Sequence, residues 1–142
     1  TISHLELNNK LHDFILEHNY DTIFIHHPGD INKDHQILFE SLMVVCRPLP
    51  KHKVKAILTY YIPSSTEWGS YERSRMFCPN VFINIESYIK IKLDALSKYT
   101  DEVREYPHPR SIENIENIAK YFGVQVGVKY AEPFCLIRYS ED

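Results

Sequence analysis

Five side chains that could bind a metal ion or move a proton lie within ten residues of one another: His26, His27, Asp30, Asp34 and His35. Imidazole nitrogens and carboxylate oxygens are typical ligands of Zn²⁺, and a hydrolytic zinc site uses three of them and leaves one position open for water. The spacing His27-x-x-Asp30, with His35 five residues on, suits such a site. It equally suits a helix start, where Asp and Asn side chains cap backbone amides and histidines are solvated. The spacing leaves both interpretations open.

A strand and a helix must position this cluster. The β-branched and aromatic run that begins at Thr22 predicts a buried strand up to His26. Apolar residues at helical spacing predict a helix from about Asp34. The polar residues therefore occupy a loop at the carboxyl end of a strand, just before a helix, which is where open α/β sheets place their functional sites.

The remaining chain alternates between helices and strands. We expect a helix that opens with a capping box at Ser3, strands over Val54–Ile62, Val81–Ile85 and Pro133–Arg138, a helix over Glu86–Lys98, and a helix from Ser111 to about Phe122 that ends at Gly123. The helix over Glu86–Lys98 should turn these residues inward: Tyr88, Ile91, Leu93, Ala95 and Leu96. The alternation predicts one α/β domain over residues 1–142, with three layers and a largely parallel sheet.

Composition excludes several classes of protein. The net charge of -3 provides no basic surface for nucleic acid. No apolar run approaches the roughly 20 residues that span a bilayer, and no signal peptide is recognisable. Cys46, Cys78 and Cys135 are odd in number and widely spaced, which predicts free, at least half-buried thiols in a reducing compartment. We expect a cytoplasmic protein.

Five segments carry a resemblance to a known family. They are HHPGDINKDHQ from His26, STEW from Ser65, PNVFINI from Pro79, PHPRS from Pro107 and GVKYAEPFCLIR from Gly127. In this order, and over nearly the whole chain, they resemble the LmbE-like, or PIG-L, family of zinc-dependent de-N-acetylases. The resemblance implies a Rossmann-like α/β/α fold and a metal-activated water that removes acetyl groups from N-acetylglucosamine-type sugars.

The resemblance also implies roles for individual residues. His35 matches a zinc ligand, although another divalent metal would suit the same position, and Asp34 would orient its imidazole or cap the helix. His108 would protonate the leaving amine or polarise the carbonyl group, and Arg110 would support it or bind the product acetate. The residues expected to line the substrate site are Asn32, Asp30 and Trp68. The resemblance assigns no role to His26 or His27.

The chain departs from the family at one important place. Family members begin with a strand and an A-H-P-D-D-E motif, which supplies two zinc ligands and the general base. The run from His27 to Asp30 keeps the His-x-x-Asp spacing but has Gly29 in the position of the catalytic Asp. We therefore expect the later part of the fold, with an unpaired strand edge and little activity by itself. A longer native protein, a truncated gene product and a completing partner chain would each explain this.

Two other functions remain open on the sequence. The chain could be a non-catalytic carbohydrate-binding or assembly module that keeps part of the fold. It could also be a different metal hydrolase in which His27, Asp30 and His35 bind zinc locally. The expected partner is an N-acetylated amino sugar or glycoconjugate, and a homo-oligomer is left open.

Overall fold

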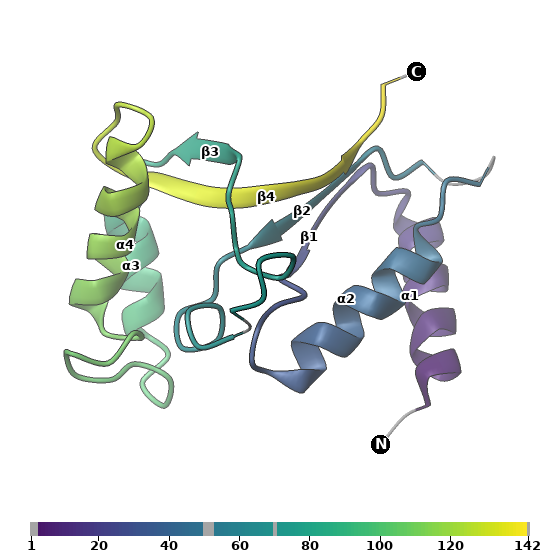
Figure 1. Ribbon diagram of the computed structural model, residues 1–142, viewed down its shortest axis with the longest axis horizontal. Helices are drawn as coiled ribbons and strands as arrows, with labels where there is room; N and C mark the ends of the chain where they lie inside the picture. Colours follow the sequence, from purple (N-terminus) through teal and green to yellow (C-terminus); the bar gives the residue numbers. More distant parts are fainter. Residues whose placement is uncertain (1–2, 50–52, 70, 142) are drawn as a thin grey trace. The chain divides into compact units, whose positions relative to one another are not determined.

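The computed structural model describes residues 3–49, 53–69 and 71–141. These residues form an α/β fold with eight elements (Figure 1): α1 (His4–His18), β1 (Thr22–His26), α2 (Lys33–Val45), β2 (Ala56–Tyr60), β3 (Val81–Asn84), α3 (Ile89–Ser97), α4 (Ile112–Val124) and β4 (Ala131–Tyr139). The contacts divide the chain into two compact units, Thr1–Cys78 with Cys135–Asp142, and Pro79–Phe134. That the chain forms a single domain stays a prediction. No helix in the described part is long and apolar enough to cross a membrane.

Local capping explains where the helices of the first unit begin and end. The Ser3 side chain accepts a hydrogen bond from the amide of Glu6 at 3.2 Å, which satisfies one of the donors that the first turn of α1 leaves open. The left-handed backbone of Asn19, with φ of 54°, ends the helix. α1 packs against α2, and α2 packs against β1. The predicted helix after Ser3 is confirmed.

The first unit is built on two parallel strands. β1 and β2 pair in register, with Ile23 opposite Ile57 and Phe24 opposite Leu58. The order of hydrogen-bonded strands places β2 between β1 and β4. The buried core of this unit consists of Ile15, Ile25, Leu42, Val45, Cys46, Val54 and Ile57. Because β1 occupies the residues predicted for it, the polar loop that follows starts where the sequence placed it.

The second unit differs from two expectations. β3 pairs with β4 in antiparallel orientation, so the largely parallel sheet that we expected is wrong on this side. α3 begins only at Ile89, and this residue, rather than Tyr88 or Ile91, is buried in the core with Ile85 and Ala119. Tyr88 and Ile91 are 63% and 65% exposed. Helical spacing alone did not determine which side of this helix would be covered.

Gly123 has a different role from the one predicted. α4 continues through Gly123 to Val124, and Ser111 caps its start by accepting from the amide of Asn114 at 3.1 Å. A Cβ atom on Gly123 would lie 2.6 Å from the carbonyl oxygen of Val128. Glycine is therefore needed here for close packing, whereas Gly127, with φ of 76°, takes the left-handed conformation after the helix.

Candidate functional site

The loop between β1 and α2 holds a buried carboxylate against a histidine. Asp30 is fully buried, and its Oδ2 accepts a hydrogen bond from Nδ1 of His35 at 3.0 Å. The side chain of Gln36 donates to the backbone oxygen of Asp30 at 2.6 Å and fixes the loop. Because a carboxylate only accepts, the proton of neutral His35 is held on Nδ1. Nε2 of His35 then carries the lone pair that a metal ligand requires.

The second oxygen of Asp30 lacks a partner. Oδ1 is buried and has no hydrogen bond to the described residues. A buried carboxylate oxygen in this state is costly, since it has lost its water and gained no donor. The site is therefore suited to a water molecule, a cation or a substrate donor at this oxygen.

His26 joins this cluster, although no role was predicted for it. Its ring lies 4.1 Å from the ring of His35, centroid to centroid, and its Nε2 lies 3.4 Å from the hydroxyl of Tyr60. Its Nδ1 is buried without a partner among the described residues. Burial first, and then the neighbouring His35, lowers the pKa of His26, while Asp30 partly offsets this. Its position as the last residue of a strand before a polar loop was the available signal.

His27 has a structural role. Its Nε2 donates to the backbone oxygen of Arg75 at 2.9 Å, so its Nδ1 accepts from the hydroxyl of Thr59 at 3.3 Å. Both ring nitrogens are thus used within the protein, and no lone pair remains for a metal. No three His, Cys, Asp or Glu side chains within residues 3–49, 53–69 and 71–141 are placed to hold a metal ion. The contacts of His27 therefore do not favour the local zinc site of His27, Asp30 and His35, which stays a prediction.

Asn32 and Asp34 lie at the exposed start of α2. The side chain of Asn32 accepts from the amide of Asp34 at 2.9 Å, which makes Asn32 the N-cap. The carboxylate that orients His35 is Asp30 and not Asp34, because the hydrogen bond from Nδ1 of His35 goes to Asp30. Asp34 instead adds a negative charge to the first turn, where the helix dipole favours it. Both residues thus contribute to the start of the helix, while a contact of Asn32 with substrate and a catalytic role of Asp34 stay predictions.

Gly69 and Arg75, which follow β2, pack on the same loop at Gly29. A Cβ atom on Gly29 would lie 1.9 Å from the backbone oxygen of Arg75, and one on Gly69 would lie 2.0 Å from the backbone oxygen of Gly29. The backbone at each glycine is thus in direct contact with another stretch of backbone, which leaves no room for a side chain at Gly29 or Gly69. Trp68, beside Gly69, is 49% exposed and is not a core residue. Its contact with substrate stays a prediction.

In the second unit, the loop before α4 fixes the tautomer of His108. The backbone amide of Arg110 donates to Nδ1 of His108 at 3.1 Å, so the proton of the neutral ring lies on Nε2. Arg110 forms an ion pair with Glu102. The hydrogen on Nε2 makes the neutral ring a donor of the kind that polarises a carbonyl group. Whether His108 and Arg110 act together with His35 stays a prediction.

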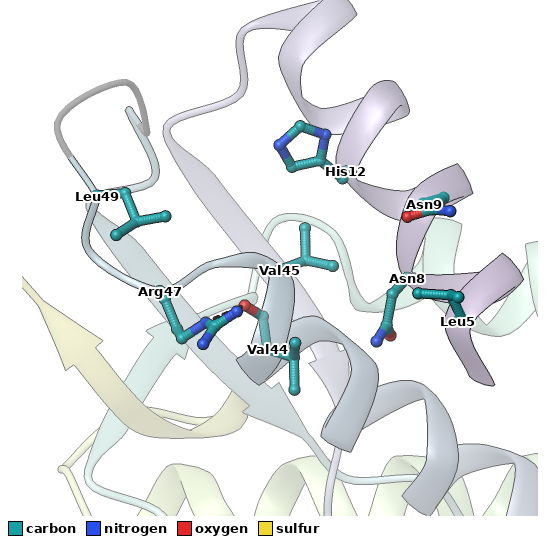
Figure 2. A pocket seen from close by; sticks show the side chains of 8 residues that line it. All are labelled: Leu5, Asn8, Asn9, His12, Val44, Val45, Arg47 and Leu49. Atoms are coloured by element: carbon teal, nitrogen blue, oxygen red, sulfur yellow. Dashed lines mark hydrogen bonds between the residues drawn. The ribbon is translucent and has the colours of Figure 1, made fainter.

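A separate groove lies at the other end of α2. It has a volume of about 350 Å³ and is lined by residues of α1, of the end of α2 and of the segment after α2, as Figure 2 shows: Leu5, Asn8, Asn9, His12, Val44, Val45, Arg47 and Leu49. Nε of Arg47 donates to the backbone oxygen of Val44 at 3.0 Å. None of these residues belongs to the predicted site. The groove is thus distinct from the cluster around His35, which lies in the first turn of α2.

No protein-family model matches the chain. The chain is 31% identical over 108 residues to YaiS of Escherichia coli K12, which is described as an uncharacterized deacetylase. The match covers 70% of this chain and 51% of YaiS. The chain therefore spans about half the length of this curated relative.

Three solved structures share the fold. The conserved protein TT1542 from Thermus thermophilus matches 96% of this chain and 60% of its own, with 19% identity and a TM-score of 0.72. N,N'-diacetylchitobiose deacetylase from Pyrococcus horikoshii, solved with its inhibitor MPG, is also similar. The match covers 96% of this chain and 52% of the deacetylase, with 18% identity and a TM-score of 0.68. The third structure is GalB, the 4-carboxy-2-hydroxymuconate hydratase from Pseudomonas putida. The match covers 99% of this chain and 62% of GalB, with 17% identity and a TM-score of 0.67. One fold thus carries a deacetylase and a hydratase, so the fold alone does not determine the reaction.

Proposed function

Because this chain is related to the LmbE-like, or PIG-L, deacetylases, we propose that it contributes to a metal-dependent deacetylase that acts on N-acetylglucosamine-type sugars. The observation that carries the proposal is the pair of His35 and the fully buried Asp30, joined at 3.0 Å. A carboxylate behind a histidine is the usual support of a zinc ligand, since it fixes the tautomer and raises the basicity of the ring. The family resemblance supports His35 as the zinc ligand.

The residues present fit one part of a zinc site. His35 supplies a nitrogen ligand through Nε2, and the partnerless Oδ1 of Asp30 favours a cation or a donor nearby. The remaining protein ligands of a three-ligand site are not found in the described residues. When bound, the metal would lower the pKa of a water molecule and polarise the acetamide carbonyl.

The other side chains have supporting roles in this proposal. His108, with its proton on Nε2, donates to the acetamide oxygen or to the leaving amine. Arg110, held by Glu102, keeps the loop of His108 in place. Trp68, which is half exposed, stacks on a sugar ring, because aromatic faces cover the apolar faces of pyranoses.

Zinc binding gives the first test. We would titrate Zn²⁺ by calorimetry into the 142-residue chain and into the same chain joined to a family strand with A-H-P-D-D-E. We expect stoichiometric binding only in the joined protein, loss of binding in His35→Ala, and affinity reduced about 10- to 100-fold in Asp30→Ala. His4→Ala, an exposed histidine on α1, is the matched control and should not change binding. Unchanged zinc affinity in His35→Ala would contradict the proposal.

Acetate release gives the second test. With added Zn²⁺, the joined protein should release acetate from N,N'-diacetylchitobiose, and a chelator or His35→Ala should abolish the release. The 142-residue chain alone should release none. If the 142-residue chain alone released acetate and His35→Ala abolished that release, the chain would need no further segment. If acetate release persisted in His35→Ala, the proposed site would be wrong.

The half-exposed Trp68 favours a second function, that of a non-catalytic carbohydrate-binding module. This function predicts affinity for N-acetylglucosamine that persists in the presence of a chelator and is lost in Trp68→Ala. The deacetylase predicts sugar binding that depends on the metal. Tryptophan fluorescence during a sugar titration, with and without chelator, separates the two.

A further inference from the structure

The imidazole of His35 lies against the imidazole of His26. The two ring centroids are 4.1 Å apart, and the ring planes are tilted by 31°. His26 is the last residue of β1, and its register partner on β2 is Tyr60. The pairing of the two strands therefore fixes the backbone of His26. His35 is thus in contact with Asp30 through Nδ1 and with a second histidine, which the sheet positions, through its ring.

Tyr60 determines which nitrogen of His26 carries the hydrogen. Its hydroxyl lies 3.4 Å from Nε2 of His26. Burial, and then the charge of Asp30, raise the pKa of Tyr60, so the hydroxyl keeps its hydrogen at neutral pH. With Tyr60 as the donor, Nε2 of His26 accepts, and the hydrogen of the neutral ring lies on Nδ1.

Two buried atoms of this cluster have complementary needs. Nδ1 of His26 and Oδ1 of Asp30 are both buried and have no hydrogen-bond partner among the described residues. The first is a donor in the tautomer that Tyr60 favours, and the second only accepts. The two groups are close enough for the charge of Asp30 to act on the imidazole of His26. Phenylalanine would provide a similar ring contact without burying an unpaired nitrogen, so the ring contact alone does not explain a histidine here.

We propose that His26 is a positioning residue for His35, because its Nδ1–H donates to Oδ1 of Asp30 while Oδ2 of the same carboxylate accepts from His35. Asp30 is then held between two histidines, and His35 keeps its Nε2 for the metal ion. A carboxylate that is fixed at both oxygens holds the ring of His35 more firmly in the orientation that a ligand requires. The proposal rests on the proposed function, in which His35 binds the ion, and it adds a residue to that site.

Nitrogen-15 NMR of the metal-free 142-residue chain at about pH 8 tests the tautomer of His26. Two other histidines provide reference signals. His18 has its hydrogen on Nδ1, which lies 2.9 Å from the backbone oxygen of Phe14, and His108 has it on Nε2. We expect the signals of His26 to match the pattern of His18. A match with the pattern of His108 would overturn the proposal, because Nδ1 of His26 would then be an acceptor.

Zinc affinity tests the effect on His35, in the protein joined to the A-H-P-D-D-E strand. His26→Asn keeps an amide donor near the place of Nδ1, His26→Leu has the same size without a donor, and His26→Phe keeps only a ring. We expect His26→Asn to retain most of the affinity, and the other two variants to lose about 10-fold. Full affinity in His26→Phe, or equal losses in His26→Asn and His26→Leu, would overturn the proposal.

The matched control is His18→Phe on α1, because the ring of His18 is also stacked, 5.4 Å from the ring of Tyr20. This variant should not change zinc affinity. Thermal melting shows which variants fold, and if His26→Phe does not, the pair of His26→Asn and His26→Leu still measures the value of the donor. If the parent joined protein bound no zinc, the proposed function would be wrong, whereas the NMR spectrum would still decide the tautomer of His26.

Discussion

β1 and β2 are neighbours of equal length, similar composition and matched register, yet their environments differ. Four of the five residues of β2 are buried, whereas only Ile25 of β1 is. Ile23 and Ile57 are opposite one another, and Ile57 is fully buried while Ile23 is only partly covered. The difference comes from the second neighbour of β2 in the sheet. The sequence of a strand specifies that its backbone is extended. The neighbouring strands determine how deeply its side chains are buried, and therefore how much they contribute to the free energy of unfolding.

The largest expected difference between the two strands is at this isoleucine pair. Ile57→Ala should lower the free energy of unfolding by about 3 kcal/mol, because it leaves a cavity in a fully buried position. Ile23→Ala, its register partner, should cost about half as much, since solvent can reach part of the site. Urea denaturation of the two variants measures both values. Equal losses would mean that β1 is as well covered as β2.

A smaller effect on the free energy of unfolding is expected at His27, which follows β1 and forms hydrogen bonds with Thr59 of β2 and with Arg75. His27→Phe removes the donor to the backbone oxygen of Arg75 and the acceptor for the hydroxyl of Thr59. The loss of these two hydrogen bonds should cost about 2 kcal/mol of unfolding free energy. The control Thr59→Val removes one of the two bonds and should cost less. If His27→Phe were as stable as the parent chain, His27 would not be a structural residue.

The end of the pair, where His26 is opposite Tyr60, should respond to pH. Burial and His35 lower the pKa of His26 below its ordinary value of 6.5. As pH falls, His26 therefore binds a proton in the unfolded state before it does so in the folded state. The contribution of neutral His26 to the free energy of unfolding is complete above pH 6.5 and is lost as pH falls through the lower, folded-state pKa. Asp30 and Tyr60 are the other titratable groups that face this ring.

The measurement is the unfolding midpoint of the metal-free chain, with chelator present, between pH 7.5 and pH 4.5. The decrease in the parent chain should become shallower in His26→Gln, which cannot be protonated. The same slope in both proteins would assign the pH dependence to other groups.

The smallest effect is expected at Phe24 in the chain alone. Because this side chain is 52% exposed, Phe24→Lys should change the free energy of unfolding by no more than about 0.5 kcal/mol, the usual range for surface substitutions. Leu58→Lys, at its buried register partner on β2, should be strongly destabilising. A large loss in Phe24→Lys would show that β1 is already covered.

Local features of the fold could be predicted from the sequence because they depend on neighbouring residues. Thr22–His26 is a strand as predicted, and Ser3 and Ser111 cap their helices, since a β-branched run favours extended backbone and a serine hydroxyl reaches an amide three residues on. The free state of the three cysteines agrees with their spacing, although Cys78 proved exposed rather than buried. Periodicity placed a helix after Glu86 but not its buried side, because the covering residues come from α4.

The sequence by itself determined the α/β class, the strand that leads into the polar loop and the presence of His35 at the start of a helix. Only the tertiary structure decided which carboxylate supports that histidine, because the turn after β1 buries Asp30 beneath the imidazole and leaves Asp34 in solvent. It also decided that His27 is structural and that His26 joins the cluster, since Thr59, Tyr60 and Arg75 lie more than thirty positions away along the chain. Spacing fixes which side chains share a helix or a strand, but contacts across the sheet fix which of them meet.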